Sequence, residues 1–234
     1  MDAQETPDAN PFDVFDREAA RLDAHFAGLD GDDWDRPSRC SGWSVRDVLA
    51  HLAGEELYNH ACLDDDLGGL FARLEKEGVD DLDAFNDWCV RTRRDRPARE
   101  VLAEWRGANA DTRRRMRERG ADAMLPTMSG PYPVGLQTWH YASEYATHAD
   151  DVAAPVDPAE RDARTAWRAE FGRFALGETD TPVQVERVPG GYRVTLDGRS
   201  AELPAAEFVE ATTGRLPDGH PLDRGLRSAL VCLA

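Results

Sequence analysis

The chain has 234 residues with a formal net charge of −17, and 41% of its residues are apolar. This length favours one or two domains, and the apolar fraction is sufficient for a buried core. The negative charge makes nucleic acid and anionic membranes unfavourable partners. No apolar run reaches the roughly 18 to 20 residues of a membrane span, and the acidic first residues lack the positive charge of a signal peptide. We therefore expect a cytoplasmic protein that binds neither nucleic acid nor membrane.

The first two thirds of the chain predict a helical bundle. Residues 11–30 carry apolar side chains at steps of three and four, and Asn10 before Pro11 is a typical helix start. Ser44 and Asp47 resemble a capping box that opens a second helix to about Leu63. Further helices are predicted over 81–95, over 98–119 and from about 134, with 121–133 as a long connection rich in glycine and proline. Four or more helices with short or moderate loops form an antiparallel bundle.

The composition changes after residue 155. A helix is predicted to about Leu176, and the alternating segments 183–188 and 192–196 flank a Pro-Gly-Gly turn, which predicts a β-hairpin. A short strand ending near Leu203 and two helices, around 204–213 and 222–232, complete this part. We predict a mainly α protein, with a bundle domain at 1–155 and a small α+β domain at 156–234 that packs on the bundle because it is small for a separate core.

A polar stripe marks the helix that begins near residue 134. His140, Glu144 and His148 recur at steps of four, so they share one face of an otherwise apolar and aromatic segment. Imidazole and carboxylate groups in this arrangement can bind a divalent metal. The two ends of the stripe lie about 12 Å apart along the helix, so one ion can use either His140 with Glu144 or Glu144 with His148.

A third ligand must come from another helix. His51 lies beside the apolar stripe of the second helix and is the best-placed candidate, and His60 is the next. Glu55, one turn after His51, is a candidate fourth ligand or general base. Four scattered cysteines without a Cys-x-x-Cys pair indicate buried free thiols rather than a zinc ribbon or a disulfide framework.

Arginines concentrate in the middle of this acidic chain. In the structural interpretation they lie on solvated helix faces, paired with nearby acids. In the functional interpretation one or two of them turn inward to hold a substrate carboxylate. The candidates for that anchor are Arg91, Arg94, Arg215, Arg224 and Arg227.

Two motifs together resemble a known family. The run from Cys40 to Gly54, CSGWSVRDVLAHLAG, and the later Glu144-x-x-x-His148-x-x-Asp151 resemble the DinB-like metal-dependent bundles of the mycothiol-dependent maleylpyruvate isomerase type. The resemblance implies a DinB-like helical bundle with a small C-terminal α+β domain. It also implies that His51, Glu144 and His148 bind a divalent metal, usually zinc, which leaves His140 as a residue that lines the pocket.

The resemblance also implies an enzyme that uses two cofactors, Zn²⁺ or another divalent metal and the thiol mycothiol. The metal would hold the thiol as thiolate, which adds to the cis double bond of a maleylpyruvate-like substrate; rotation and elimination would then give the trans isomer. Other members transfer the thiol to a small electrophile. We expect a mycothiol-dependent isomerase or S-transferase that acts as a monomer or homodimer, with Glu55 and His140 as candidate catalytic residues. The alternative is a non-catalytic small-molecule-binding or resistance protein that reuses the bundle.

Overall fold

The computed structural model describes residues 6–233, which divide into two compact units. One unit spans Asn10–Pro155, and the other comprises the described residues from Val156 onward together with residues 6–9. The described helices and small antiparallel sheets confirm the predicted mainly α class with a smaller α+β part. Within residues 6–233, no helix is both long enough and apolar enough to cross a bilayer.

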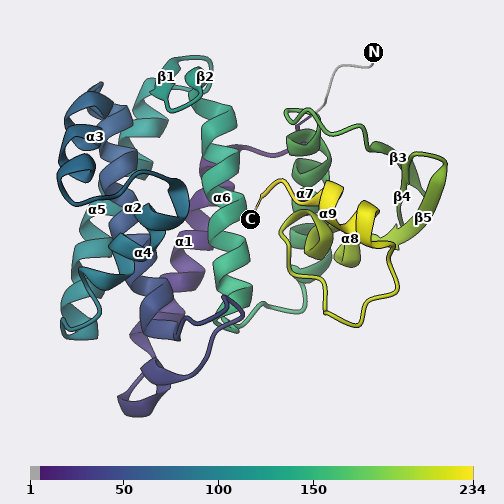
Figure 1. Ribbon diagram of the computed structural model, residues 1–234. Coiled ribbons are helices and arrows are strands. Elements are labelled where there is room, and N and C mark those ends of the chain that lie inside the picture. The colour runs from purple at the N-terminus through teal and green to yellow at the C-terminus, as the bar shows by residue number, and fades with distance from the viewer. Residues whose placement is uncertain (1–5, 234) are drawn as a thin grey trace. The chain divides into compact units, whose positions relative to one another are not determined.

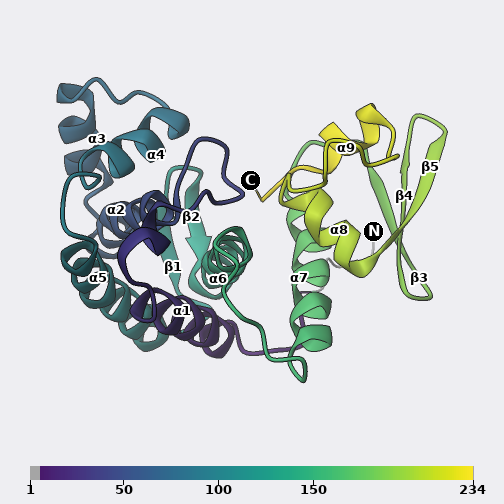
Figure 2. The same cartoon turned by 90° about the horizontal axis from the view of Figure 1, so that it is seen from below.

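The first unit is built on four long helices (Figures 1 and 2). Helix α1 packs on α6 and α5, and α2 packs on α5, so that the apolar stripes of all four helices face a common core. This arrangement confirms the predicted bundle. The bounds of the four helices are α1 Pro11–Ala27, α2 Val45–Asp64, α5 Ala98–Arg119 and α6 Val134–Asp151.

Local sequence signals fix where these helices begin and end. The Asn10 side chain accepts the backbone N–H groups of Phe12 and Asp13, and Pro11 occupies the first helical position, where no N–H is needed. At α2, Ser44 and Asp47 form the predicted capping box in both directions. Helix α5 ends at Gly120, whose φ of 83° favours glycine.

The segment between α2 and α5 differs from the prediction. Residues 67–76, which were not predicted as a helix, form α3 (Leu67–Lys76), and α4 (Leu82–Arg91) is shorter than the predicted 81–95. Two glycines near the start of α3 weaken its helical signal, but Leu70 and Leu74 are buried against the bundle and so stabilise the helix through packing.

Helix α4 approaches α2 closely at Gly54. A Cβ atom at this position would lie 2.3 Å from the Cβ of Cys89, so only glycine allows the observed contact between the two helices.

The predicted connection at 121–133 is a β-hairpin. Strands β1 (Met124–Thr127) and β2 (Gly130–Pro133) pair antiparallel, and Thr127 lies opposite Gly130. Prolines at the strand positions hid this hairpin in the sequence, because proline is disfavoured within sheets except at edges.

The second unit is α+β, as predicted. Helix α7 (Arg161–Leu176) precedes an antiparallel sheet in the order β3-β4-β5, and the strands are followed by α8 (Ala205–Thr212) and α9 (Arg224–Leu230). The strand bounds are β3 Gln184–Val188, β4 Gly191–Leu196 and β5 Arg199–Pro204. Tyr192 stacks on Phe208 with ring centroids 4.3 Å apart, which joins the sheet to α8 in the core of this unit. The packing of this unit on the bundle stays a prediction.

Candidate metal centre

Helix α2 presents His51 two turns after its N-terminus. The Asp47 carboxylate accepts the backbone N–H of Ser44, and its other oxygen lies 3.0 Å from Arg94 Nε of the segment after α4. Burial raises the pKa of Asp47, but these bonds outweigh it and hold the pKa below its usual value. His51 itself is buried, with its ring centroid 5.2 Å from that of Trp43. The start of α2 is therefore fixed by hydrogen bonds and an ion pair, and the His51 ring packs beside Trp43.

Helix α6 brings Glu144 and His148 to the same point. His51 Nε2 lies 3.2 Å from Glu144 Oε1, and His148 Nε2 lies 3.9 Å from that same oxygen. The rings of His51 and His148 meet edge to face with centroids 4.9 Å apart. The structure thus brings together the three residues to which the family resemblance points.

These residues fit a divalent metal. One ligand atom from each lies within 4.8 Å of the others. Nitrogen and oxygen ligands placed tetrahedrally about 2.0 to 2.2 Å from zinc are about 3.5 Å apart, and the separations of 3.2 and 3.9 Å given above bracket this value. Two imidazoles and one carboxylate are a donor set typical of a zinc site that keeps a position open for a reactive molecule.

The other ring nitrogen of His148, Nδ1, contacts Asp151 and Cys40. His148 Nδ1 and Cys40 Sγ each lie 3.1 Å from Asp151 Oδ2, and Cys40 Sγ lies 3.8 Å from His148 Nδ1. Burial lowers the pKa of His148, but the bonds to Asp151 and Cys40 outweigh it and raise the pKa to about 10. A carboxylate on the second ring nitrogen orients a metal-binding histidine, so Asp151 can fix the direction of Nε2.

Cys40 is the residue near the centre that the sequence interpretation missed. It was predicted to be one of four buried thiols outside any disulfide. None of the four forms a disulfide within the described chain, but Cys40 and Cys232 are only half-buried. The backbone N–H of Arg39 donates to the carbonyl of Asp151, which ties the loop before α2 to the end of α6. The signal that could have located Cys40 is its place at the start of the same run that carries Trp43 and His51.

Glu55 lies one turn after His51 and is buried. Its Oε2 atom has no hydrogen-bond partner within the described part of the chain. Burial, and then the negative charge of Glu144, raise the pKa of Glu55 well above its usual range. For Glu144, burial also raises the pKa, but the contact with His51 outweighs it and the pKa is lowered. Two neighbouring carboxyl groups with pKa values shifted apart are typical of acid–base chemistry.

A buried polar network beside the centre holds three helices together. Glu56 of α2 accepts hydrogen bonds from Asn109 and Thr112 of α5 and from Tyr145 of α6, at 2.8, 2.5 and 2.9 Å. Tyr145 also accepts from Trp105 Nε1 at 2.9 Å. Because Glu56 and Tyr145 directly follow Glu55 and Glu144 in the chain, the network fixes the distance between the two helices that carry the centre.

The other predicted histidines lie elsewhere. His140 is one turn before Glu144 on α6, and its Nε2 lies 3.4 Å from the Tyr132 hydroxyl. It belongs to neither candidate ligand group within residues 6–233, which are His51 with Glu144 and His148, and Cys40 with His148 and Asp151. His60 Nε2 lies 3.2 Å from the carbonyl oxygen of Ala108 on α5, which removes it as an alternative third ligand.

The arginines of the middle segment are mostly paired with acids, as the structural interpretation of the sequence predicted. Arg94 pairs with Asp47, and further ion pairs follow the same pattern, among them Arg93 and Arg96 with Glu104, Arg113 and Arg117 with Asp16, Arg114 with Asp111 and Glu118, and Arg115 with Asp64. These guanidinium groups already have carboxylate partners within the bundle.

Comparisons with known proteins agree with this architecture. Two solved structures have the same fold: a crystal structure of the mycothiol-dependent maleylpyruvate isomerase, and one of a variant of it with a histidine replaced by alanine. Each has a TM-score of 0.60 and covers 89% of this chain and 90% of its own, with 14% and 13% sequence identity respectively. No curated protein matches the chain. Residues 15–153 match the family described as the mycothiol maleylpyruvate isomerase N-terminal domain. This match covers more than half of the sequence and includes every residue of the centre described above, so the chain belongs to that family.

Proposed function

We propose that this protein is a metal- and thiol-dependent enzyme, in which His51, Glu144 and His148 hold a divalent metal, preferably zinc. The observation that carries the proposal is the convergence of two histidines and one glutamate from two helices, within a chain of a mycothiol-associated family. When bound, the metal would lower the pKa of a small thiol such as mycothiol and keep it as the nucleophilic thiolate. The substrate would be a small electrophile, either a maleylpyruvate-like molecule that is isomerised or an acceptor to which the thiol is transferred.

The residues around the centre supply orientation and protons. Asp151 orients the His148 ring through Nδ1. Glu55 is buried next to Glu144 with a free carboxyl oxygen, so it can carry a proton to or from a molecule at the centre. His140 is half-buried one turn away on α6, and we infer that its imidazole binds a substrate oxygen. In this proposal Glu55 and His140 are the catalytic groups contributed by the chain.

The first test is metal content. Purified protein should contain about one zinc per chain, and His51→Ala should lose most of it, because three-ligand sites lose much of their affinity when one ligand is removed. His60→Ala is a matched control on the same helix, since His60 bonds to a backbone carbonyl outside the centre. Equal metal content in the two variants would contradict the proposed ligand set.

The second test is turnover. With mycothiol and maleylpyruvate, an isomerase conserves the thiol, whereas an S-transferase consumes one thiol per product, so thiol titration beside product analysis distinguishes the two. Glu55→Gln should retain the metal and lose about 10²-fold or more in turnover, as is typical when a general acid–base group is removed. Tight binding of electrophiles without any thiol-dependent turnover would instead establish a non-catalytic binding protein.

A further inference from the structure

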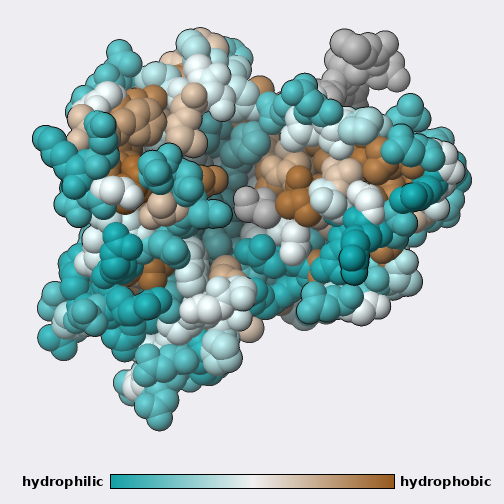
Figure 3. Space-filling view, viewed as in Figure 1, coloured by the Kyte–Doolittle hydropathy of each residue, from teal (hydrophilic) through white to brown (hydrophobic). Residues whose placement is uncertain are grey.

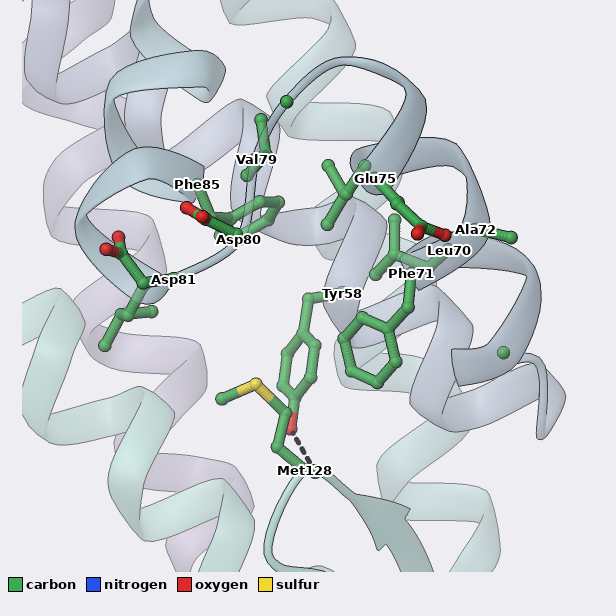
Figure 4. Close-up of a pocket in the computed structure, with 14 residues that line it drawn as sticks. Tyr58, Leu70, Phe71, Ala72, Glu75, Val79, Asp80, Asp81, Phe85 and Met128 are labelled. Atoms are coloured by element: carbon green, nitrogen blue, oxygen red, sulfur yellow. Dashed lines mark hydrogen bonds between the residues drawn. The ribbon is translucent and has the colours of Figure 1, made fainter.

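A large apolar pocket lies beside Tyr58, on the same side of α2 as the metal centre. It has a volume of about 820 Å³, and its walls come from α2, α3, α4, the 77–81 connection and the turn of the β1–β2 hairpin. Figure 4 shows Tyr58 among the side chains that line it, with the Tyr58 hydroxyl directed at Met128. The backbone N–H of Met128 donates to this hydroxyl at 3.1 Å, which fixes the hairpin turn at the pocket wall.

Three apolar side chains that line the pocket are exposed to solvent. Phe71, Leu82 and Met128 are 42%, 55% and 59% exposed, and they make up three of the five large hydrophobic residues classed as exposed in the described chain. Figure 3 shows the resulting apolar surface over α3, in the upper left of the view. Concentration of exposed apolar groups in one concave site is typical of a ligand-binding surface, because an apolar ligand would remove them from water.

The charges of the pocket disfavour an anionic ligand. Its described lining residues include no arginine, lysine or histidine, but they include Glu75, Asp80 and Asp81. A carboxylate group placed here would find no cationic partner and three negative neighbours. The pocket therefore suits an uncharged apolar group and disfavours a dicarboxylate such as maleylpyruvate.

The pocket is also aligned with the metal centre. Tyr58 follows His51 by seven residues, which returns it to the same face of α2 about 10 Å further along the axis, and Glu55 lies between them. His51, Glu144 and His148 do not themselves line the pocket, so a ligand with its ring beside Tyr58 must span this distance of about 10 Å to place a reacting group at the centre.

We propose that this pocket binds the uncharged, ring-bearing apolar end of the electrophile on which the metal centre acts. The assignment rests on the proposed function for the reacting end, whereas the pocket itself can be tested by binding alone. The predicted substrate class is a neutral electrophile with an aromatic or alicyclic group, such as an aryl enone.

The binding test uses two fluorescent probes with the same ring skeleton. N-phenyl-1-naphthylamine is neutral, and 1-anilinonaphthalene-8-sulfonate carries one negative charge. The full chain should bind the neutral probe and bind the sulfonate at least about tenfold more weakly, because the sulfonate would be desolvated without a cationic partner. Equal affinity for the two probes, or no binding of the neutral probe, would overturn the proposal.

Matched substitutions locate the bound probe. The double change Phe71→Gln and Met128→Gln should weaken binding of the neutral probe by at least about fivefold, because both side chains lose apolar contact. Met124→Gln is the control, since Met124 is 53% exposed on the same hairpin but does not line the pocket. All these positions are exposed, so the variants should fold, as thermal melts would verify. An equal loss of affinity in the Met124 variant would place the probe elsewhere and refute the assignment.

A turnover assay tests the substrate assignment separately from the proposed function. With mycothiol and a neutral aryl enone, benzylideneacetone, the thiol adds across the double bond: a carbon–sulfur bond forms, and the thiol proton goes to the carbon beside the carbonyl. We expect the double variant to raise KM by at least about fivefold with little change in kcat, because the pocket binds a remote part of the substrate. Turnover with an unchanged KM would overturn the substrate assignment alone. Probe binding without any mycothiol-dependent turnover would overturn the proposed function, and with it the substrate assignment.

Discussion

Removal of the Glu56 carboxylate should destabilise the bundle more than any exposed change of similar size. Glu56 is 2% exposed and accepts three hydrogen bonds, from one α6 and two α5 side chains. In Glu56→Ala, the donors of Asn109, Thr112 and Tyr145 lose this acceptor while they remain buried. The perturbation therefore acts at the point where three helices of the bundle meet.

The expected loss follows from these contacts. A buried hydrogen-bonding group left without a partner costs about 1 to 3 kcal/mol. The hydroxyl donors of Thr112 and Tyr145 lose their acceptor, whereas Asn109 keeps its bond to the Tyr145 hydroxyl at 2.8 Å. Two such donors set a range of about 2 to 6 kcal/mol, and water that enters the space left by the side chain lowers its upper end. We expect a loss of about 3 to 5 kcal/mol in the free energy of unfolding. Glu56→Gln should cost about 1 kcal/mol, because its amide oxygen can retain two of the bonds.

The assay is urea unfolding followed by circular dichroism, with the slope of the transition compared between variants. Glu118→Ala is the control, because Glu118 lies exposed on α5 with only an i,i+4 ion pair to Arg114 and should cost less than about 0.5 kcal/mol. A loss below about 1 kcal/mol for Glu56→Ala at an unchanged slope would refute the reasoning, since it would mean that the network contributes little to the bundle.

Three further predictions concern the helices that carry the centre. Asp47 has a lowered pKa in the folded state, so its stabilisation is complete above about pH 4 and is lost as the pH falls through the folded value; Asp47→Asn should remove this part of the acid sensitivity in stability measurements at pH 2 to 5. Gly54→Ala should destabilise the protein by about 1 to 3 kcal/mol in urea unfolding, because the new methyl group would overlap Cys89. Asp151→Asn should weaken metal binding by about tenfold or more in competition with a chelator, because His148 loses its orienting carboxylate; unchanged affinity would show that Asp151 does not act on the centre.

The helices of the bundle could be predicted because their signals are local. Asn10 with Pro11, the Ser44–Asp47 box and Gly120 set helix ends through neighbours a few residues away, and the structure has the same ends. Helix α3 and the β1–β2 hairpin were missed for the opposite reason. The two glycines of α3 and the prolines of the hairpin weaken the local signals, and packing against α2 compensates for this.

The candidate centre could be predicted only in part from spacing. Steps of four along α6 leave His140 and His148 equivalent as partners of Glu144, and nothing local decides between them. The choice depends on where α2 meets α6, which places His51 against the Glu144–His148 end. Cys40 depends on a backbone bond between two segments more than a hundred residues apart, so its place beside His148 could not be read from its neighbours.

The segment from Leu67 to Arg91, which contains α3 and α4, has a consequence for how ligand selectivity can change among related proteins. The candidate ligands come from α2 and α6. Helices α3 and α4 form much of the pocket wall, and in the sequence they lie between the bundle helices α2 and α5. If the pocket binds substrate as proposed, substitutions in this one contiguous stretch would alter which molecules bind without changing the candidate ligands on α2 and α6. Exchange of the stretch between related chains would then transfer ligand selectivity in one step. Gly54 and the facing Cys89 must be exchanged together, because the two positions are in close contact.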